Sequence, residues 1–208
     1  MESTAPAEPR RAPEPPDPEH LATIEARRVA LQADFARIVP PGGRVVWEIG
    51  CGHGHFLTAY AAAHPAALCL GVDQDAFRVR RAVKKQERAG LTNLHFLRAE
   101  ARLFLDTLPP GVGLAAIFIL FPDPWPKRRH HKHRLLQADF FRALAARAGQ
   151  ATPFCFRTDH EEYFREVEQL LAAHPDWRIV PGAPWPFEET TVFEQKAPSH
   201  HSLVAVRR

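Results

Sequence analysis

The sequence predicts an α/β fold in which helices cover both faces of a mostly parallel sheet. Two observations support this fold class. Short apolar runs typical of strands alternate along the chain with longer stretches of helical periodicity. A glycine-rich loop follows the first of these runs, at a strand end where open α/β sheets bind ligands. The chain has 208 residues, which is enough to bury a sizeable core.

The N-terminal part is predicted to be a tail followed by a helix. Residues 1–20 are rich in Pro, Glu and Ala and have almost no large apolar side chains, so we expect a disordered tail. Over Leu21–Ile38, apolar residues recur at roughly helical spacing, and the Pro40–Pro41 pair ends that helix. We expect residues 21–208 to form a single domain.

The rest of the chain alternates between strand and helix signals. Strands are predicted at Arg44–Ile49, Leu68–Val72, Leu94–Leu97, Leu114–Phe121 and Phe154–Arg157. Helices are predicted at about Gly54–Ala63, Asp75–Ala89, Gln137–Ala148 and Glu161–Ala173. Gly90 stands where a helix C-cap belongs, and Asp159 with Glu162 resembles a capping box. Two later segments are predicted as additional edge strands, Trp177–Val180 and Leu203–Val206.

Composition excludes several classes of protein. Apolar residues make up 45% and charged residues 25%, and the net charge of +3 alone does not indicate a nucleic-acid partner. Cys51, Cys69 and Cys155 are widely spaced, which predicts buried free thiols in a reducing compartment. No apolar stretch approaches the roughly 20 residues that span a bilayer, and no signal-peptide pattern begins the chain. We therefore expect a cytoplasmic protein outside the membrane.

The loop after the first predicted strand reads EIGCGHGHF and contains Glu48, Gly50, Gly52 and Gly54. Glycines let the chain turn tightly and bring its backbone close to a ligand. The spacing is GxGxG, whereas dinucleotide-binding loops use GxGxxG to seat a pyrophosphate. This difference makes a dinucleotide oxidoreductase the least favoured alternative.

Acidic residues end the first three strands. Asp73 ends the second strand in GVD, and Glu100 follows the third in RAE. With Glu48, they suit S-adenosylmethionine, which presents cationic groups, ribose hydroxyls and an adenine instead of a phosphate chain. A carboxylate after the second strand can accept both ribose hydroxyls. The alternatives are a helix cap for Asp73 and a surface acid for Glu100.

The stretch FPDPWPKRRHHKHR follows the fourth predicted strand and is the most informative in the sequence. Prolines on both sides of Asp123 restrict the backbone, and Trp125 offers a flat aromatic face nearby. Five of the eight residues from Lys127 to Arg134 are permanent cations. An acid beside an aromatic and a basic run suits RNA, although a solvated charged face is the alternative. The three histidines of this run, His130, His131 and His133, lack metal-ligand spacing, so no metal is expected.

The sequence offers no plausible pair of catalytic nucleophile and base, which is compatible with methyl transfer to a ring nitrogen such as N7 of an RNA guanine. N7 carries an in-plane lone pair, so no proton must be removed before it attacks a methyl group. Such an enzyme needs proximity and orientation rather than a covalent nucleophile or a strong base. A carboxylate such as Asp123 can orient the base through its N1/N2 edge and tolerate the cationic product.

Together, EIGCGHG, GVD, FPDPWPKRRHHKHR, RTD and TVFEQK resemble the bacterial tRNA (guanine-N7-)-methyltransferase family from about Arg44 to the C-terminus. The resemblance implies a Rossmann-like class I methyltransferase fold, with a seven-stranded sheet whose last strand is antiparallel. It implies methylation of tRNA, usually at the variable-loop guanine, position 46. It implies that Asp123 is the catalytic-site acid and that S-adenosylmethionine is bound by Glu48, Asp73, Glu100 and Asp123, beside the glycines of the loop.

The resemblance also implies a set of substrate-binding residues. Lys127 and Asp159 are expected to contact the substrate, and with them the segment Thr191, Val192, Phe193 and Glu194. The basic run is expected to approach the RNA through Arg129, His130, His131, Lys132, His133 and Arg134. The chain departs from the family where Asp73 replaces a common Glu and Glu100 a common Asp.

Three alternatives stay open. One is a methyltransferase acting on another RNA guanine or on a small molecule, and the second is an RNA-binding protein without catalysis. The third is the dinucleotide oxidoreductase. Intact glycines and acids argue against loss of catalysis, and the basic run argues against a small molecule. A monomer and a homodimer are equally compatible with the sequence.

Overall fold

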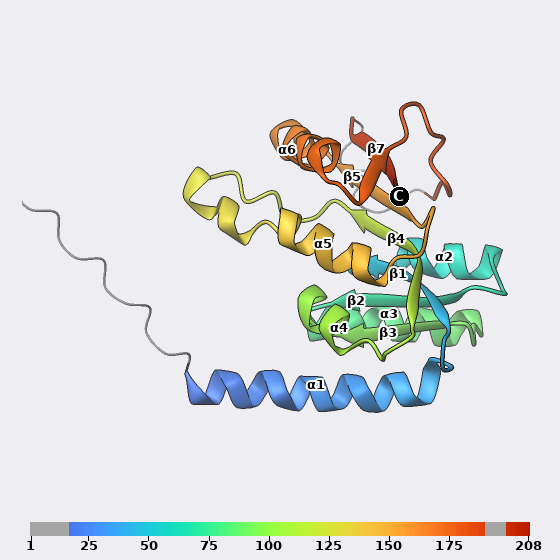
Figure 1. Cartoon of the computed structure of the whole chain (residues 1–208). Helices are drawn as coiled ribbons and strands as arrows, with labels where there is room; N and C mark the ends of the chain where they lie inside the picture. The colour runs from blue at the N-terminus through green and yellow to red at the C-terminus, as the bar shows by residue number, and fades with distance from the viewer. Residues whose placement is uncertain (1–16, 190–198) are drawn as a thin grey trace, which may run out of the picture.

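The computed structural model describes residues 17–189 and 199–208. It contains a seven-stranded sheet in the order β3-β2-β1-β4-β5-β7-β6, flanked by helices on both faces (Figure 1). The strands are β1 Arg44–Ile49, β2 Leu68–Asp73, β3 Leu94–Arg98, β4 Gly113–Leu120, β5 Pro153–Thr158, β6 Trp177–Ile179 and β7 His201–Arg207. The helices are α1 Pro18–Ile38, α2 His55–Ala63, α3 Ala76–Ala89, α4 Ala101–Thr107, η1 Arg128–His133, α5 Ala138–Arg147 and α6 Glu161–Ala173.

Two apolar clusters hold the layers together. Strand side chains alternate between the faces, so neighbouring residues such as Val46 and Trp47 enter different clusters. On one face, Phe56 of α2 and the start of α3 pack against β1, β3 and β4. On the other face, Trp47 stacks on Phe104 of α4 at 4.5 Å, together with residues of α1, α5 and α6. The sheet is therefore buried on both faces, as a parallel sheet requires.

The strand order places a ligand-binding edge beside β1. The chain runs from β1 outward to β2 and β3, then returns to β4 on the opposite side of β1. Ile49, the last residue of β1, pairs with Val72 of β2 and Ile119 of β4. The loops that follow these three strands therefore leave the sheet at one edge, at the reversal where open α/β sheets bind ligands.

Most predicted elements are confirmed to within one or two residues, and the exceptions are short or depend on distant partners. Helix α1 begins at Pro18 with Asp17 as its N-cap, which places three residues of the expected tail in the helix. The expected disorder of residues 1–16 lies outside the described part. Helix α4 and η1 were not predicted. The final segment is antiparallel as expected, but it lies between β5 and β6 and is not an edge strand.

Two local predictions about helix ends have different outcomes. Gly90 caps α3 with a left-handed φ of 65°, as predicted. The capping box at Asp159 was wrong, because the N-cap of α6 is His160, whose Nδ1 accepts from the Tyr163 N–H at 3.2 Å. Asp159 lies one residue before the cap and is exposed.

Of the helices in the described ranges, none combines the length and apolarity that crossing a bilayer requires.

Candidate cofactor and active site

The glycine loop after β1 is a tight turn held against β2. Gly50 and Cys51 both donate their N–H groups to the Val72 carbonyl, at 2.8 and 3.0 Å. Gly50, Gly52 and Gly54 all have positive φ, which side-chain-bearing residues rarely adopt. A Cβ added at Gly50 or Gly52 would meet no atom within 4 Å, so these two positions border open space.

Gly54 has a different environment. A Cβ added there would lie 2.5 Å from Cζ of Phe96 and 2.9 Å from Cβ of Ala82. The absence of a side chain at Gly54 lets the start of α2 pack closely against β3 and α3. Gly54 was predicted as a cofactor-binding residue, and its surroundings show that it also has a packing role, whereas Gly50 and Gly52 border open space.

Glu48 is a buried acid, 3% exposed, within the sheet at the start of this loop. Burial raises the pKa of its carboxyl to about 8, the Leu57 N–H opposes this by donating to it, and the nearby negative charge of Asp73 adds to the rise. Among the described residues, its Oε2 has no hydrogen-bond partner. A buried acceptor without a donor is costly, so a cationic or N–H-bearing ligand group would stabilise it.

Asp73 connects the end of β2 to the glycine loop. Its Oδ2 accepts from the Gly52 N–H at 3.0 Å, and its Oδ1 accepts from the Asp75 N–H at 2.8 Å. The helix-capping role belongs to Asp75, which accepts from Phe77 and Arg78 at the start of α3. Each oxygen of Asp73 keeps acceptor capacity for a ligand hydroxyl.

Glu100 is more exposed than the other two acids. It immediately precedes α4, and its carboxylate pairs with Arg27 of α1 at 3.3 Å, with both side chains part exposed. Helix α1 therefore reaches the rim of the site, which the sequence did not indicate. A ligand at Glu100 would meet this guanidinium as well.

The turn after β4 carries Asp123 between two strained residues. Phe121 and Trp125 have φ of 50° and 44°, conformations that are unusual for residues with side chains and that cluster at functional sites. Phe121 donates its N–H to the Arg157 carbonyl at 2.8 Å, so the FPDP turn lies beside the end of β5. This bond brings together the turns that carry Asp123 and Asp159, both of which are exposed.

The basic run forms η1, which is exposed at most of its positions. Lys127, Arg128, Arg129, Lys132 and His133 are exposed, and His130 and His131 are half-buried. Trp125 packs against the rings of His133 and His130, with ring centroids 5.2 and 5.9 Å away. The predicted RNA-facing cations of this run therefore project into solvent around an aromatic side chain.

Arg134 departs from that prediction because its side chain is fully buried. Its Nε donates to the Pro124 carbonyl at 2.8 Å, its Nη1 bonds the Glu166 carboxylate, and its guanidinium lies 4.9 Å from the Tyr163 ring centre. These contacts leave no surface for RNA. They join the FPDP turn to α6, so we assign Arg134 to holding this turn.

Arg157 is a site residue that the sequence did not single out. It is buried at the end of β5, where its guanidinium bonds the Glu188 carboxylate at 2.8 and 3.0 Å and its Nε donates to Ser202 at 2.9 Å. It also lies 4.1 Å from the ring centre of Trp185. The RTD sequence was the only signal. The predicted segment Thr191–Glu194 lies outside the described residues.

The groups at this edge suit S-adenosylmethionine. Two glycines border open space, a buried carboxylate lacks a donor, and a second carboxylate has free acceptor capacity. Cys51, Cys69 and Cys155 are free and buried as predicted. Among residues 17–189 and 199–208, no group of three His, Cys, Asp or Glu side chains is arranged to hold a metal ion.

Solved structures of similar fold are methyltransferases. The chain superposes on the 16S rRNA methyltransferase KamB with a TM-score of 0.59 at 18% identity, covering 84% of this chain and 93% of that one. It superposes on TrmN from Thermus thermophilus with a TM-score of 0.55 at 18% identity, covering 87% and 48%. These similarities concern the fold alone. The sheet with a reversed β7 and a glycine loop after β1 defines a class I methyltransferase, whose methyl donor is S-adenosylmethionine.

Sequence relatives are more specific. A family model described as "Putative methyltransferase" matches residues 43–204. The tRNA (guanine-N(7)-)-methyltransferase of Roseobacter denitrificans is 36% identical over 165 residues, which are 74% of this chain and 69% of that protein. Its counterpart in Chromohalobacter salexigens is 32% identical over 183 residues, 85% of this chain and 72% of that protein. The chain belongs to the tRNA (guanine-N7-)-methyltransferase family.

Proposed function

We propose that this protein transfers a methyl group from S-adenosylmethionine to N7 of the guanine at position 46 in the variable loop of tRNA. The observation that carries the proposal is the juxtaposition, at one sheet edge of a chain of this family, of an acid-lined glycine loop and the Asp123 turn. We also propose a cytoplasmic location, since it would give the protein access to tRNA.

Five residues of this chain are assigned to the methyl donor, which supplies an electrophilic methyl carbon. Gly50 and Gly52 allow its amino-acid part to approach the backbone. Glu48 accepts hydrogen bonds from its ammonium group, which satisfies the unpaired Oε2. Asp73 accepts hydrogen bonds from the ribose hydroxyls. Glu100 is assigned to the adenine side, where a bond to the ligand would replace part of its ion pair with Arg27.

Asp123 is assigned to the guanine. Its exposed carboxylate can accept from the N1 and N2 hydrogens of the base, which fixes the orientation of N7. No base catalyst is required, because N7 attacks through a lone pair. The carboxylate also lies where positive charge develops on the methylated ring, so its charge stabilises the product side of the reaction.

The remaining predicted residues are assigned to the rest of the tRNA. Lys127 and Asp159 border the Asp123 turn. Thr191–Glu194, which lie outside the described residues, are assigned to the substrate on the family resemblance alone. Arg128, Arg129 and Lys132 of η1 contact phosphates, and the half-exposed face of Trp125 is available to a base.

The test is methyl transfer from radiolabelled S-adenosylmethionine to unmodified tRNA transcripts, followed by nucleoside analysis. We expect 7-methylguanosine in a transcript with G46 and none in a matched transcript with A46. Label in both transcripts would move the target to another guanine. If neither transcript is labelled and ribosomal RNA assayed in parallel is labelled, ribosomal RNA replaces tRNA as the substrate.

A further inference from the structure

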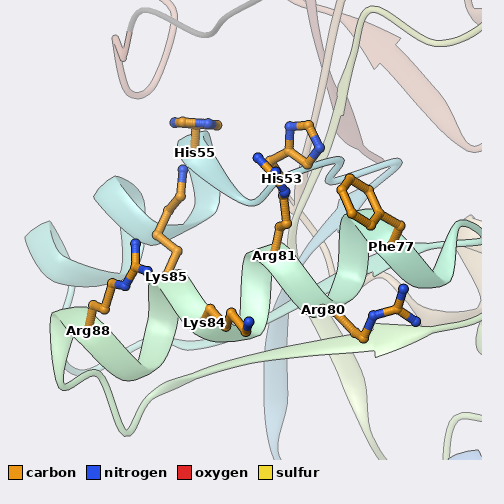
Figure 2. Close-up of a pocket in the computed structure, with 8 residues that line it drawn as sticks. All are labelled: His53, His55, Phe77, Arg80, Arg81, Lys84, Lys85 and Arg88. Carbon is orange, nitrogen blue, oxygen red and sulfur yellow. The ribbon is translucent and has the colours of Figure 1, made fainter.

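A second basic surface lies on α3, outside the site described above. An open groove of about 560 Å³ is bordered by His53, His55, Phe77, Arg80, Arg81, Lys84, Lys85 and Arg88, which together we call the α3 groove. Figure 2 shows Lys85 pointing from α3 toward His55 at the start of α2. The family resemblance and the predicted site residues did not include this surface.

Acids only partly offset the cations of the α3 groove: the charge of Arg80 helps to lower the pKa of Asp75, and Glu87 is the one acid within Ala76–Ala89. Arg80, Arg81, Lys84, Lys85 and Arg88 form no ion pair among the described residues, whereas Arg78 on the same helix pairs with Asp73. Several exposed cations on other helices do form ion pairs, such as Arg165 with Glu161 on α6 and Arg102 with Asp106 on α4.

This arrangement is unfavourable for the helix by itself. Arg80 and Lys84, Arg81 and Lys85, and Lys84 and Arg88 are like charges four residues apart, and each such pair destabilises a helix by about 0.2–0.5 kcal/mol. Burial and the charge of Lys85 both lower the pKa of His55, and the Glu189 carboxylate opposes them more weakly. A bound anion would relieve the repulsion between these cations. A solvated helix face on which positive and negative side chains alternate has no such repulsion.

The groove also has the extent and position of a polynucleotide contact. From Arg80 to Arg88 the helix axis rises about 12 Å, enough to meet several successive phosphates of one strand. Phe77 is 52% exposed at one end, where a base can stack on it, and Arg81 lies over its ring at 4.8 Å. His53 belongs to the glycine loop itself, so the groove adjoins the cofactor-binding turn.

We propose that the α3 groove binds the phosphate backbone of the tRNA that the active site methylates, as a second contact distinct from η1. The proposal rests on the proposed function. Sheet order separates the two surfaces, because α3 joins β2 to β3 and η1 follows β4 on the opposite side of β1. One tRNA would then cross the sheet edge above the glycine loop, with its target base at Asp123.

The test compares two triple variants with equal loss of charge. R81Q/K84Q/R88Q removes exposed cations of the α3 groove and keeps helix-forming side chains. R142Q/R165Q/R178Q removes exposed cations of α5, α6 and β6, which lie away from the groove. For each protein, tRNA affinity is measured from 50 to 300 mM salt, with S-adenosylmethionine affinity and methyl transfer measured in parallel.

We expect R81Q/K84Q/R88Q to bind tRNA roughly tenfold more weakly, with a salt slope smaller by about 2–3, and to bind S-adenosylmethionine normally. The control variant should keep most of both the affinity and the slope. An unchanged slope in R81Q/K84Q/R88Q, or an equal loss in the control, overturns the α3 contact while wild-type methylation stands. A wild-type protein that neither binds nor methylates tRNA overturns the proposed function instead, and the α3 contact with it.

Discussion

Glu48 links the electrostatics of the sheet edge beside the glycine loop to the stability of the fold. Its pKa of about 8 lies above the ordinary value of 4.5, so the folded state binds more protons than the unfolded state between these pH values. The stability it contributes is therefore present below pH 4.5 and is lost as the pH rises through 8. A bound ammonium group would hold the carboxylate charged and remove this dependence.

Replacement of Glu48 by Gln should therefore separate stability from ligand binding. At pH 4, Glu48→Gln and wild type should have similar free energies of unfolding, because both side chains are then largely neutral in the folded and in the unfolded state. At pH 9, the ligand-free variant should be more stable by about 1–4 kcal/mol, yet bind S-adenosylmethionine about 10–100-fold more weakly. Urea denaturation and calorimetry measure the two quantities. A variant less stable than wild type at pH 9 would contradict the assigned pKa.

The glycines of the loop should respond differently to the same added methyl group. Gly50→Ala places its Cβ in open space at a φ of 73°, so we expect a cost of about 1–2 kcal/mol and loss of S-adenosylmethionine binding. Gly54→Ala adds contacts of 2.5 Å with Phe96 to its left-handed φ and should destabilise the fold by more than Gly50→Ala. Thermal unfolding measures the stability of both variants, and calorimetry measures their affinity for S-adenosylmethionine. Equal destabilisation would show that both glycines serve packing.

Asp123 should affect turnover without affecting the fold. Its side chain is exposed, so Asp123→Ala should change the free energy of unfolding by less than about 0.5 kcal/mol. Loss of the group that orients guanine should lower kcat by at least about 100-fold. Single-turnover methyl transfer with saturating tRNA measures the effect. Near-normal activity would place the catalytic acid elsewhere. Asp159→Ala removes a second exposed carboxylate, on the adjoining turn, and is the variant with which Asp123→Ala is compared.

The site residues that could be identified from the sequence are those that lie at or just after the end of a predicted strand. Glu48, Asp73 and Asp123 follow apolar runs, so their positions at one edge follow from parallel strand order. Arg134 could not be distinguished from its basic neighbours, because its burial depends on Glu166, which is 32 residues away along the chain. The pairing of Arg27 with Glu100 spans 73 residues and left no local pattern either.

Among the elements, the segment from the FPDP turn to η1 has a shape that depends on Arg134. This guanidinium bonds the Pro124 carbonyl and the Glu166 carboxylate, so α6 holds the turn that carries Asp123. The left-handed backbone at Phe121 and Trp125 would otherwise favour rearrangement. A cation of the basic run thus supports the turn of Asp123, the proposed catalytic acid.

Arg134→Leu and Arg128→Leu should therefore differ although both remove one cation of the basic run. Arg134→Leu should lower the free energy of unfolding by about 1–3 kcal/mol, a range that allows for the partial exposure of Glu166, and should reduce kcat more than tRNA affinity. Arg128→Leu should leave stability unchanged and weaken tRNA binding. Urea denaturation with steady-state kinetics compares them. A smaller salt slope in Arg134→Leu would return this residue to the RNA surface.

The elements that the sequence did not predict share a physical reason. Helix α4 has seven residues, which is two turns, and η1 has six, so neither presents enough periodicity to detect. The place of β7 between β5 and β6 comes from pairing with two strands distant in sequence, such as Phe156 with Leu203. Longer elements such as α3 and α6 were predictable because each has an apolar stripe and a defined end.

For the molecule as a whole, the strand order reverses beside β1, and basic side chains lie on elements from both sides of this reversal, α3 and η1. The chain carries a net charge of only +3, yet cations gather on η1 and on α3. The sequence pattern placed η1 beside the site, since it directly follows a strand end. The sequence pattern did not indicate that α3 lies near the site. The fold brings the cations of α3 beside His53 and His55.

If one tRNA contacts both surfaces at once, their losses should add. R128Q/R129Q/K132Q should reduce the salt slope of tRNA binding by about 2–3, and its combination with R81Q/K84Q/R88Q should reduce it by the sum of the separate reductions. Additivity is expected because the two surfaces share no contact and each neutralises its own phosphates. Titrations of labelled tRNA at several salt concentrations form the double-mutant cycle. If the surfaces were alternative sites for different RNA molecules, either one alone would retain binding, and the combined loss would exceed that sum. The stoichiometry at saturation discriminates further, since one tRNA per chain is required for a bridge across the glycine loop.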